Sequence, residues 1–265
     1  MSKYKLGVLG LGNMGGSILN GIINSSLYNK EEIFIYDIDK TKLEKFNGIN
    51  VSLNEKDLIE NVEMLIVAVK PQMINVLKTI EFNNKDLTII SIVAGKTVND
   101  LKEIFGDVKV IRVMPNTPAL INEGSTAISR TFDVTDEVFN KVKKIFSAIG
   151  IVEEISDELM NEIIPVNGSM PAYLYYFAKA FIENAVEEGI DYEVAKKLAS
   201  YAIIGSAKMI LETDKSIDQL IKDVCSPKGA TLEGLKVFDD NKVNEIIKKA
   251  SKACIQRAYE LSKIE

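Results

Sequence analysis

The sequence contains no histidine and no tryptophan among its 265 residues, and only two of its residues are cysteines. The absence of histidine excludes a Ser-His-Asp hydrolase triad, a histidine-ligated zinc site and any mechanism with a histidine acid or base. The cysteines, Cys225 and Cys254, lie far apart and provide neither a disulfide framework nor the close spacing of a metal site. We therefore expect no bound metal and a location in the reducing cytoplasm.

Basic clusters and long apolar runs are also absent. The formal net charge is -6, and because nucleic-acid binding depends on clustered Lys and Arg, we expect no nucleic-acid partner. A long uncharged segment near the N-terminus, residues 6–29, contains six glycines and four asparagines. This composition is unsuited to an apolar helix that spans about 30 Å of hydrocarbon, and an A-x-A-like cleavage site is missing. We expect neither a signal peptide nor association with a membrane.

The glycines of this segment fit a phosphate-binding loop. Residues 5–9 have the pattern of a short buried strand, Gly10-x-Gly12-x-x-Gly15 follows, and helical spacing continues over residues 17–23. In such a loop Gly10 permits the tight turn, Gly12 lets the backbone approach a pyrophosphate, and Gly15 lets the helix pack close to the strand. The helix N-terminus offers unpaired N–H groups and partial positive charge to the phosphates. The alternative is an ordinary glycine turn in an α/β protein.

A carboxylate stands where the ribose of a dinucleotide would bind. A second strand, residues 32–36, ends in Asp37, roughly 20 residues beyond Gly15, which is the spacing of a ribose-binding carboxylate. Such a carboxylate accepts a hydrogen bond from the 2′-hydroxyl and repels a 2′-phosphate. Asp37 and the glycine loop together predict a dinucleotide site that prefers NADH over NADPH.

The pattern of strands and helices repeats along the first half of the chain. We expect strands at residues 50–53, 64–69, 87–93 and 108–113, with helices at 55–61 and 98–105. Near-continuous apolar runs are typical of parallel strands buried on both faces, and ligands of such sheets bind beyond the carboxyl ends of the strands. The segments at those ends are Val69-Lys70-Pro71, Ala94-Gly95 and residues 114–118, which include Asn116. A purely structural interpretation is also open, since proline stops strands and fixes turns.

The second half has helical spacing only, at residues 160–188, 192–211, 217–224 and 243–264. Several of these segments are apolar on more than one side, which favours an interface between subunits. We predict an α/β protein with a Rossmann-type dinucleotide-binding domain at residues 1–156 and an all-α substrate-binding and dimerisation domain at residues 157–265. The expected assembly is a homodimer or larger homo-oligomer formed through the C-terminal helices.

One bend interrupts the helical half at Cys225-Ser-Pro-Lys-Gly-Ala-Thr231. Pro227 and Gly229 indicate a turn, and Thr231 is a candidate N-cap for a helix over residues 232–238. The first interpretation is a connector with a helix cap. The second is an anion-binding bend, in which backbone N–H groups from Gly229 onward and the hydroxyls of Ser226 and Thr231 hold a carboxylate.

These motifs together resemble the pyrroline-5-carboxylate reductases, which form L-proline, and the resemblance covers essentially the whole chain. Its most specific parts are Gly168-Ser-Met-Pro-Ala-Tyr173 and the bend at residues 225–231. Further parts are Gly10-Leu-Gly-Asn-Met-Gly15, Ala68-Val-Lys-Pro-Gln72, Ser91-Ile-Val-Ala-Gly95 and Arg112-Val-Met-Pro-Asn-Thr-Pro-Ala119. The sequence departs from the family at Met170 and Lys228, where the family usually has glycine.

The resemblance implies hydride transfer from NADH or NADPH to the cyclic imine of 1-pyrroline-5-carboxylate. A protonated imine is already electrophilic, so the transfer needs no strong general acid, in agreement with the absence of histidine. By similarity, the substrate carboxylate binds to Ser226, Gly229, Ala230 and Thr231, and the catalytic residue is Thr231, whose hydroxyl also lies near the ring nitrogen. The implied cofactor-binding residues are Gly10, Gly12, Asn13, Met14, Gly15, Asp37, Ala68, Val69, Lys70, Pro71 and Asn116.

Two other functions stay open at this point. A β-hydroxyacid dehydrogenase also joins a Rossmann domain to helices, but that family relies on a lysine and an asparagine one helical turn apart. Lys179 and Asn184 are not aligned on one face of a helix, which disfavours this function. The second alternative is a dinucleotide-binding protein without catalytic activity.

Overall fold

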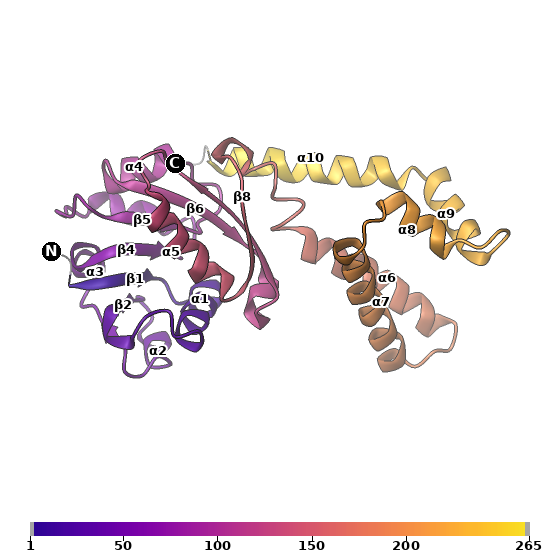
Figure 1. The fold of residues 1–265 in the computed structure, drawn as a ribbon, viewed down its shortest axis with the longest axis horizontal. Helices are drawn as coiled ribbons and strands as arrows, with labels where there is room; N and C mark the ends of the chain where they lie inside the picture. Colours follow the sequence, from indigo (N-terminus) through magenta and orange to yellow (C-terminus); the bar gives the residue numbers. More distant parts are fainter. Residues whose placement is uncertain (1–2, 263–265) are drawn as a thin grey trace. The chain divides into compact units, whose positions relative to one another are not determined.

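The computed structural model describes residues 3–262, and eight strands within this range form one sheet in the order β3-β2-β1-β4-β5-β6-β7-β8 (Figure 1). The neighbouring strands from β1 to β6 are all parallel, as expected for a Rossmann-type domain. The ends of the two predicted domains, residues 1–2 and 263–265, lie outside the described residues, as does the end of the helix predicted over 243–264. The strands are β1 Tyr4–Leu9, β2 Ile33–Tyr36, β3 Asn50–Val51, β4 Val62–Val67, β5 Thr88–Ser91, β6 Lys109–Pro115, β7 Gly124–Arg130 and β8 Gly150–Glu154.

Alternating side chains along the strands divide the core of the sheet into two layers. In β4, Met64 and Ile66 belong to the cluster that includes side chains of α1 and α5, while Leu65 and Val67 belong to the cluster with α3 and α4. Because helices cover both faces (Figure 1), the central strands β1, β4 and β5 are mostly apolar. The helices of this part are α1 Asn13–Asn24, α2 Lys40–Leu43, α3 Glu55–Asn61, α4 Val98–Phe105 and α5 Asp136–Ser147, with 3-10 turns at Lys30–Glu32, Ile74–Thr79, Thr117–Ile121 and Asp157–Leu159.

The sequence analysis missed the last two strands and the helix between them. β7 pairs antiparallel with β6, and β8 pairs parallel with β7. Polar residues such as Thr126 and Ser129 occupy buried positions of β7, which hides the apolar pattern of a strand. The helix α5 did carry a signal, because its buried Phe139, Val142 and Phe146 have the spacing of an amphipathic helix.

The helix predicted over residues 160–188 begins ten residues later, and this part of the prediction is wrong. Residues 160–169 form turns, and α6 extends over Met170–Glu187. Pro165 lacks the N–H that a continuous helix would need. Pro171 is tolerated because it lies in the first turn of α6, where N–H groups have no helical acceptor.

The chain divides into two compact units. The first is the sheet with its helices, and it contains the described residues up to Pro171 together with those from Cys254 onward. The second is helical and extends over Ala172–Ala253. None of the helices within residues 3–262 is long and apolar enough to cross a membrane. The helices after α6 are α7 Tyr192–Glu212, α8 Ile217–Val224, α9 Ala230–Asp240 and α10 Val243–Ser262.

Candidate active site

The glycine loop between β1 and α1 needs glycine for different reasons at its three positions. Gly10 has a φ of +93°, a conformation that favours glycine. A Cβ atom on Gly15 would lie 2.1 Å from the carbonyl oxygen of Gly10, so only glycine lets α1 pack this closely. A Cβ atom on Gly12 would meet no protein atom within 4 Å. Gly12 therefore borders open space at the N-terminus of α1, where backbone N–H groups and the helix dipole favour a phosphate.

Two cavities adjoin the loop and share Gly12, Ala68, Val69 and Lys70 in their walls. The first, of about 440 Å³, lies beyond the ends of β1 and β2 and includes Asp37. The second, of about 670 Å³, extends to the carboxyl ends of β5 and β6 and includes Ala94, Gly95, Met114 and Pro115. Two adjoining cavities on either side of a glycine loop suit the two nucleotides of a dinucleotide.

Most of the predicted cofactor-binding residues line these cavities. The first cavity has Gly10 and Asp37 in its wall, and the second has Asn13, Met14 and Pro71, in addition to the four shared residues. The exceptions are Gly15, which packs α1 against the loop, and Asn116.

The side chain of Asn116 is engaged in a buried polar network behind the second cavity. Its amide nitrogen donates to Ser125 Oγ at 2.9 Å and to the carbonyl oxygen of Asn167 at 3.3 Å, and its amide oxygen accepts the N–H of Ser125 at 2.9 Å. The Asn167 side chain accepts the Ser125 hydroxyl and donates to the carbonyl oxygen of Met114 at 2.6 Å. Asn167 thus holds Met114 in the cavity wall, and Asn116 supports Met114 indirectly through its bonds to Ser125 and Asn167. Neither Ser125 nor Asn167 was predicted as part of the site, and Asn167 lies 51 residues beyond Asn116 along the chain.

Arg112 and Ser169 are further wall residues that the sequence analysis did not assign to the site. Arg112 is buried, and its guanidinium donates to Asp157 Oδ1 at 2.8 Å, an atom that also accepts the hydroxyl of Ser129 at 2.9 Å. An arginine inside an apolar strand is itself a signal, because arginine is seldom buried without a partner. The hydroxyl of Ser169 lies 3.3 Å from the sulfur of Cys254.

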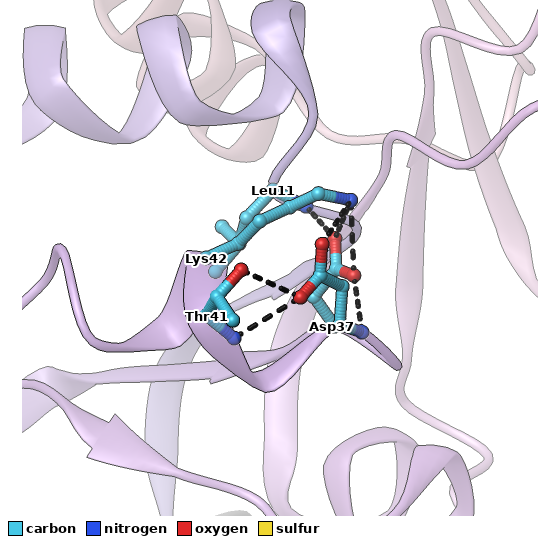
Figure 2. Close-up of polar contacts among 5 residues, drawn as sticks. Leu11, Asp37, Thr41 and Lys42 are labelled. Atoms are coloured by element: carbon cyan, nitrogen blue, oxygen red, sulfur yellow. Dashed lines mark hydrogen bonds and ion pairs between the residues drawn. The ribbon is translucent and has the colours of Figure 1, made fainter.

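Asp37 follows β2, and its nearly buried carboxylate binds three protein groups. Oδ2 accepts the N–H of Leu11 at 2.6 Å, and Oδ1 accepts the N–H of Asp39 at 2.8 Å. The ammonium of Lys42 lies 3.2 Å from both carboxylate oxygens, and Figure 2 shows its side chain reaching from α2 over Asp37. The carboxylate thus ties the end of β2 to the glycine loop and to α2.

Further acidic and aromatic groups surround Asp37. Asp39 caps α2, and its carboxylate accepts the hydroxyl and the N–H of Thr41 at 2.7 and 3.1 Å. These hydrogen bonds hold the pKa of Asp39 below its usual value, which keeps the group charged at neutral pH. Burial raises the pKa of the Tyr36 hydroxyl, and the negative charges of Glu55 and Asp37 add to that effect. Tyr36 is therefore a neutral hydrogen-bonding group in the wall of the first cavity.

The bend predicted to bind the substrate carboxylate joins α8 to α9. Gly229 is the N-cap of α9 and Thr231 lies in the first turn, so the predicted N-cap at Thr231 is wrong. The reason is packing, because a Cβ atom on Gly229 would lie 2.4 Å from Ser226 Oγ, and glycine lets the chain turn into the helix early. The N–H groups of Ala230 and Thr231 stand in the first turn, where a helix has no acceptors of its own. Ser226 and these groups lie at a helix end that favours an anion.

Lys228 adopts a left-handed conformation in the same bend, with a φ of +59°. A residue with a side chain costs about 1–2 kcal/mol in this region, whereas glycine adopts it freely. This explains why glycine suits the position in the family that the motifs resemble. In this chain the bend keeps the same turn with a strained lysine.

The parallel strands β1 to β6, the glycine loop and the adjoining cavities define a Rossmann-type dinucleotide-binding protein. Residues 157–261 match the family model for pyrroline-5-carboxylate reductase dimerisation, and residues 5–95 match the model described as NADP oxidoreductase coenzyme F420-dependent. The pyrroline-5-carboxylate reductase of Escherichia coli (strain K12) is 37% identical over 267 residues, which cover 98% of this chain and 99% of that protein. The chain belongs to the pyrroline-5-carboxylate reductase family, and the resemblance found in the sequence is confirmed.

Other relatives agree with this assignment. The pyrroline-5-carboxylate reductase of Synechocystis sp. (strain ATCC 27184 / PCC 6803 / Kazusa) is 34% identical and covers 98% of this chain and 99% of its own length. The crystal structure of Plasmodium falciparum pyrroline carboxylate reductase with NADP bound has a TM-score of 0.87 at 30% identity, covering 99% of this chain and 100% of that one. The similarity therefore extends over both compact units.

Proposed function

We propose that this chain reduces 1-pyrroline-5-carboxylate to L-proline with a hydride from a nicotinamide dinucleotide. The observation that carries this function is the family membership, which extends over the full length of the chain and of its relatives. The glycine loop and the two adjoining cavities supply a site of the required kind for the cofactor.

The residues of the first unit fit a dinucleotide. The open space beside Gly12 admits a pyrophosphate to the N-terminus of α1, and the first cavity offers Asp37 to a ribose. The second cavity, with Ala94 and Gly95 in its wall, suits the nicotinamide ring. The bound cofactor supplies the hydride. The walls exclude water and fix the ring, and such alignment contributes about 7 kcal/mol or more in favourable systems.

In the second unit, Ser226, Gly229, Ala230 and Thr231 hold the substrate carboxylate, and the hydroxyl of Thr231 lies near the ring nitrogen. The support is the geometry of the bend, which leaves the first-turn N–H groups of α9 available to an anion. A protonated imine accepts a hydride directly, so these groups act by binding and orienting the substrate.

The finer proposal is a preference for NADH. Asp37 disfavours a 2′-phosphate, so we expect kcat/KM to be at least roughly tenfold higher with NADH than with NADPH, about 1.4 kcal/mol. The test mixes the purified protein with 1-pyrroline-5-carboxylate and either cofactor at equal concentration and follows the absorbance of the reduced nicotinamide. A faster reaction with NADPH would contradict the role of Asp37, and the absence of oxidation with either cofactor would contradict the reductase function itself.

We also propose a homodimer or larger homo-oligomer formed through the C-terminal helices. Large apolar side chains of α6 and α7 are exposed in the single chain, among them Tyr176, Phe181, Leu198 and Tyr201. The match of residues 157–261 to a dimerisation model supports the same assembly. Light scattering on the purified protein in solution measures its mass, and a mass equal to that of one chain would contradict the proposal.

The domain boundary between residues 156 and 157 is supported by the start of the dimerisation match at residue 157. A cytoplasmic location is supported by the two unpaired cysteines, Cys225 and Cys254. Lys179, the lysine considered for a β-hydroxyacid dehydrogenase, is exposed and forms an ion pair with Glu183 at 3.5 Å within α6, which does not support that reaction.

A further inference from the structure

We propose that Lys42 determines how strongly the site discriminates between NADH and NADPH. Lys42 would do so by neutralising Asp37 and by offering its ammonium to a 2′-phosphate. This inference rests on the proposed function, because it concerns the cofactor of that reaction.

The hydrogen bonds that Asp37 already accepts leave no lone pair for a further donor. A carboxylate has about four lone-pair positions for hydrogen bonds. In Asp37, the N–H groups of Leu11 and Asp39 occupy one position on each oxygen, and the Lys42 ammonium lies 3.2 Å from both oxygens and occupies the others (Figure 2). A ribose 2′-hydroxyl can therefore donate to Asp37 only if Lys42 withdraws from at least one of the oxygens.

The side chain of Lys42 has room to move away from Asp37. Its side chain retains 34% of its accessible surface, whereas the Asp37 side chain retains 6%. Lys42 lines the first cavity, and it also lines a third cavity of about 490 Å³, which shares Gly12 with the first and includes Asn20 and Lys45. A lysine ammonium on a flexible stem with space on both sides can change partners at small cost.

Lys42 affects the binding of the two cofactors differently. A 2′-hydroxyl competes with Lys42 for Asp37, so Lys42 contributes little to NADH binding or opposes it. A 2′-phosphate is repelled by Asp37 and by Asp39. The Lys42 ammonium forms ion pairs with both carboxylates, at 3.2 Å from Asp37 and 4.0 Å from Asp39, while Lys45 also exerts a positive charge on Asp39. Lys42 therefore offsets part of the repulsion that Asp37 and Asp39 exert on NADPH.

The test measures the binding of 5′-ADP and of adenosine 2′,5′-bisphosphate to the full-length protein, by calorimetry and without substrate. In Lys42→Met we expect the Kd of the bisphosphate to rise at least roughly tenfold, and the Kd of 5′-ADP to fall or to change by less than about threefold. Lys42→Arg keeps the positive charge and is expected to retain most of the affinity for the bisphosphate. Lys40→Met is the matched control, because Lys40 is an exposed lysine of the same helix and is absent from the walls of both cavities.

An equal loss of affinity for both nucleotides in Lys42→Met would overturn the inference, because it would indicate that Lys42 only maintains the local structure. An unchanged affinity for the bisphosphate, or an equal effect of Lys40→Met, would overturn it as well. Because the probes contain no nicotinamide and no imino acid is present, the result is independent of whether the chain reduces 1-pyrroline-5-carboxylate.

Discussion

A Gly12→Ala substitution is expected to raise the Kd for NADH by roughly 100-fold, about 2.7 kcal/mol, and to leave the free energy of unfolding nearly unchanged. The added methyl group meets no protein atom within 4 Å, and the φ of -65° at Gly12 is accessible to alanine. Alanine is a poorer N-cap than glycine, which costs a small part of the stability, and the main loss is the space beside the N-terminus of α1 that the proposed pyrophosphate needs. Fluorescence titration with NADH and urea unfolding measure the two quantities on the same protein.

Neighbouring glycines provide the controls for this prediction. A Cβ atom on Gly16 would lie 3.6 Å from the nearest atom, the carbonyl oxygen of Leu11, which is an ordinary contact, so Gly16→Ala should leave NADH binding intact. A Cβ atom on Gly15 would lie 2.1 Å from the carbonyl oxygen of Gly10, so Gly15→Ala should lower the stability itself. If the Gly12→Ala protein binds NADH as tightly as the parent protein, the glycine loop is not part of the cofactor site.

A Thr231→Ala substitution is expected to reduce kcat/KM for 1-pyrroline-5-carboxylate by roughly 100-fold, which is the size of effect seen when one donor to a reacting group is removed. The cofactor affinity should stay the same, because Thr231 belongs to the helical unit and the proposed cofactor residues belong to the first unit. The side chain is exposed at the start of α9, so its removal should cost little stability. Steady-state kinetics with varied imino acid, together with NADH titration, separates the two effects.

The hydroxyl of Thr231 can be tested apart from its methyl group. Thr231→Ser keeps the hydroxyl and should retain most of the activity, whereas Thr231→Val keeps the shape and should resemble Thr231→Ala. Equal activity of the serine and valine variants would contradict a role for the hydroxyl. A parallel weakening of NADH binding would point to a structural effect instead.

The first half of the fold could be predicted because its signals are local. The helices at 55–61 and 98–105 were predicted with their observed bounds, since each has an N-cap residue and a regular apolar face. β7 escaped prediction because its burial depends on pairing with β6, and polar residues such as Thr126 fill its buried positions. α6 starts late because of Pro165. This proline is a local signal in the sequence, but the long apolar pattern around it predicted a longer helix.

The candidate site was predictable to the extent that it depends on short motifs. The glycine loop and Asp37 lie at fixed distances along the chain, and their places at strand ends follow from the fold class. The bond of Asp37 to Leu11 and the bond of Asn116 to Asn167 join segments far apart in sequence. Such contacts depend on the tertiary arrangement, so the role of Lys42 and the supporting role of Asn116 became visible only in the structure.

The first compact unit is made of two separate pieces of chain. Its second piece begins at Cys254, whose sulfur lies beside the Ser169 hydroxyl, and it includes Tyr259, whose hydroxyl donates to Glu162. In topological terms the helical unit is an insertion, and the polypeptide returns afterwards to complete the unit that carries the dinucleotide cavities. A truncation just before Cys254 would therefore remove part of the nucleotide-binding unit and leave the helical insertion with a free end.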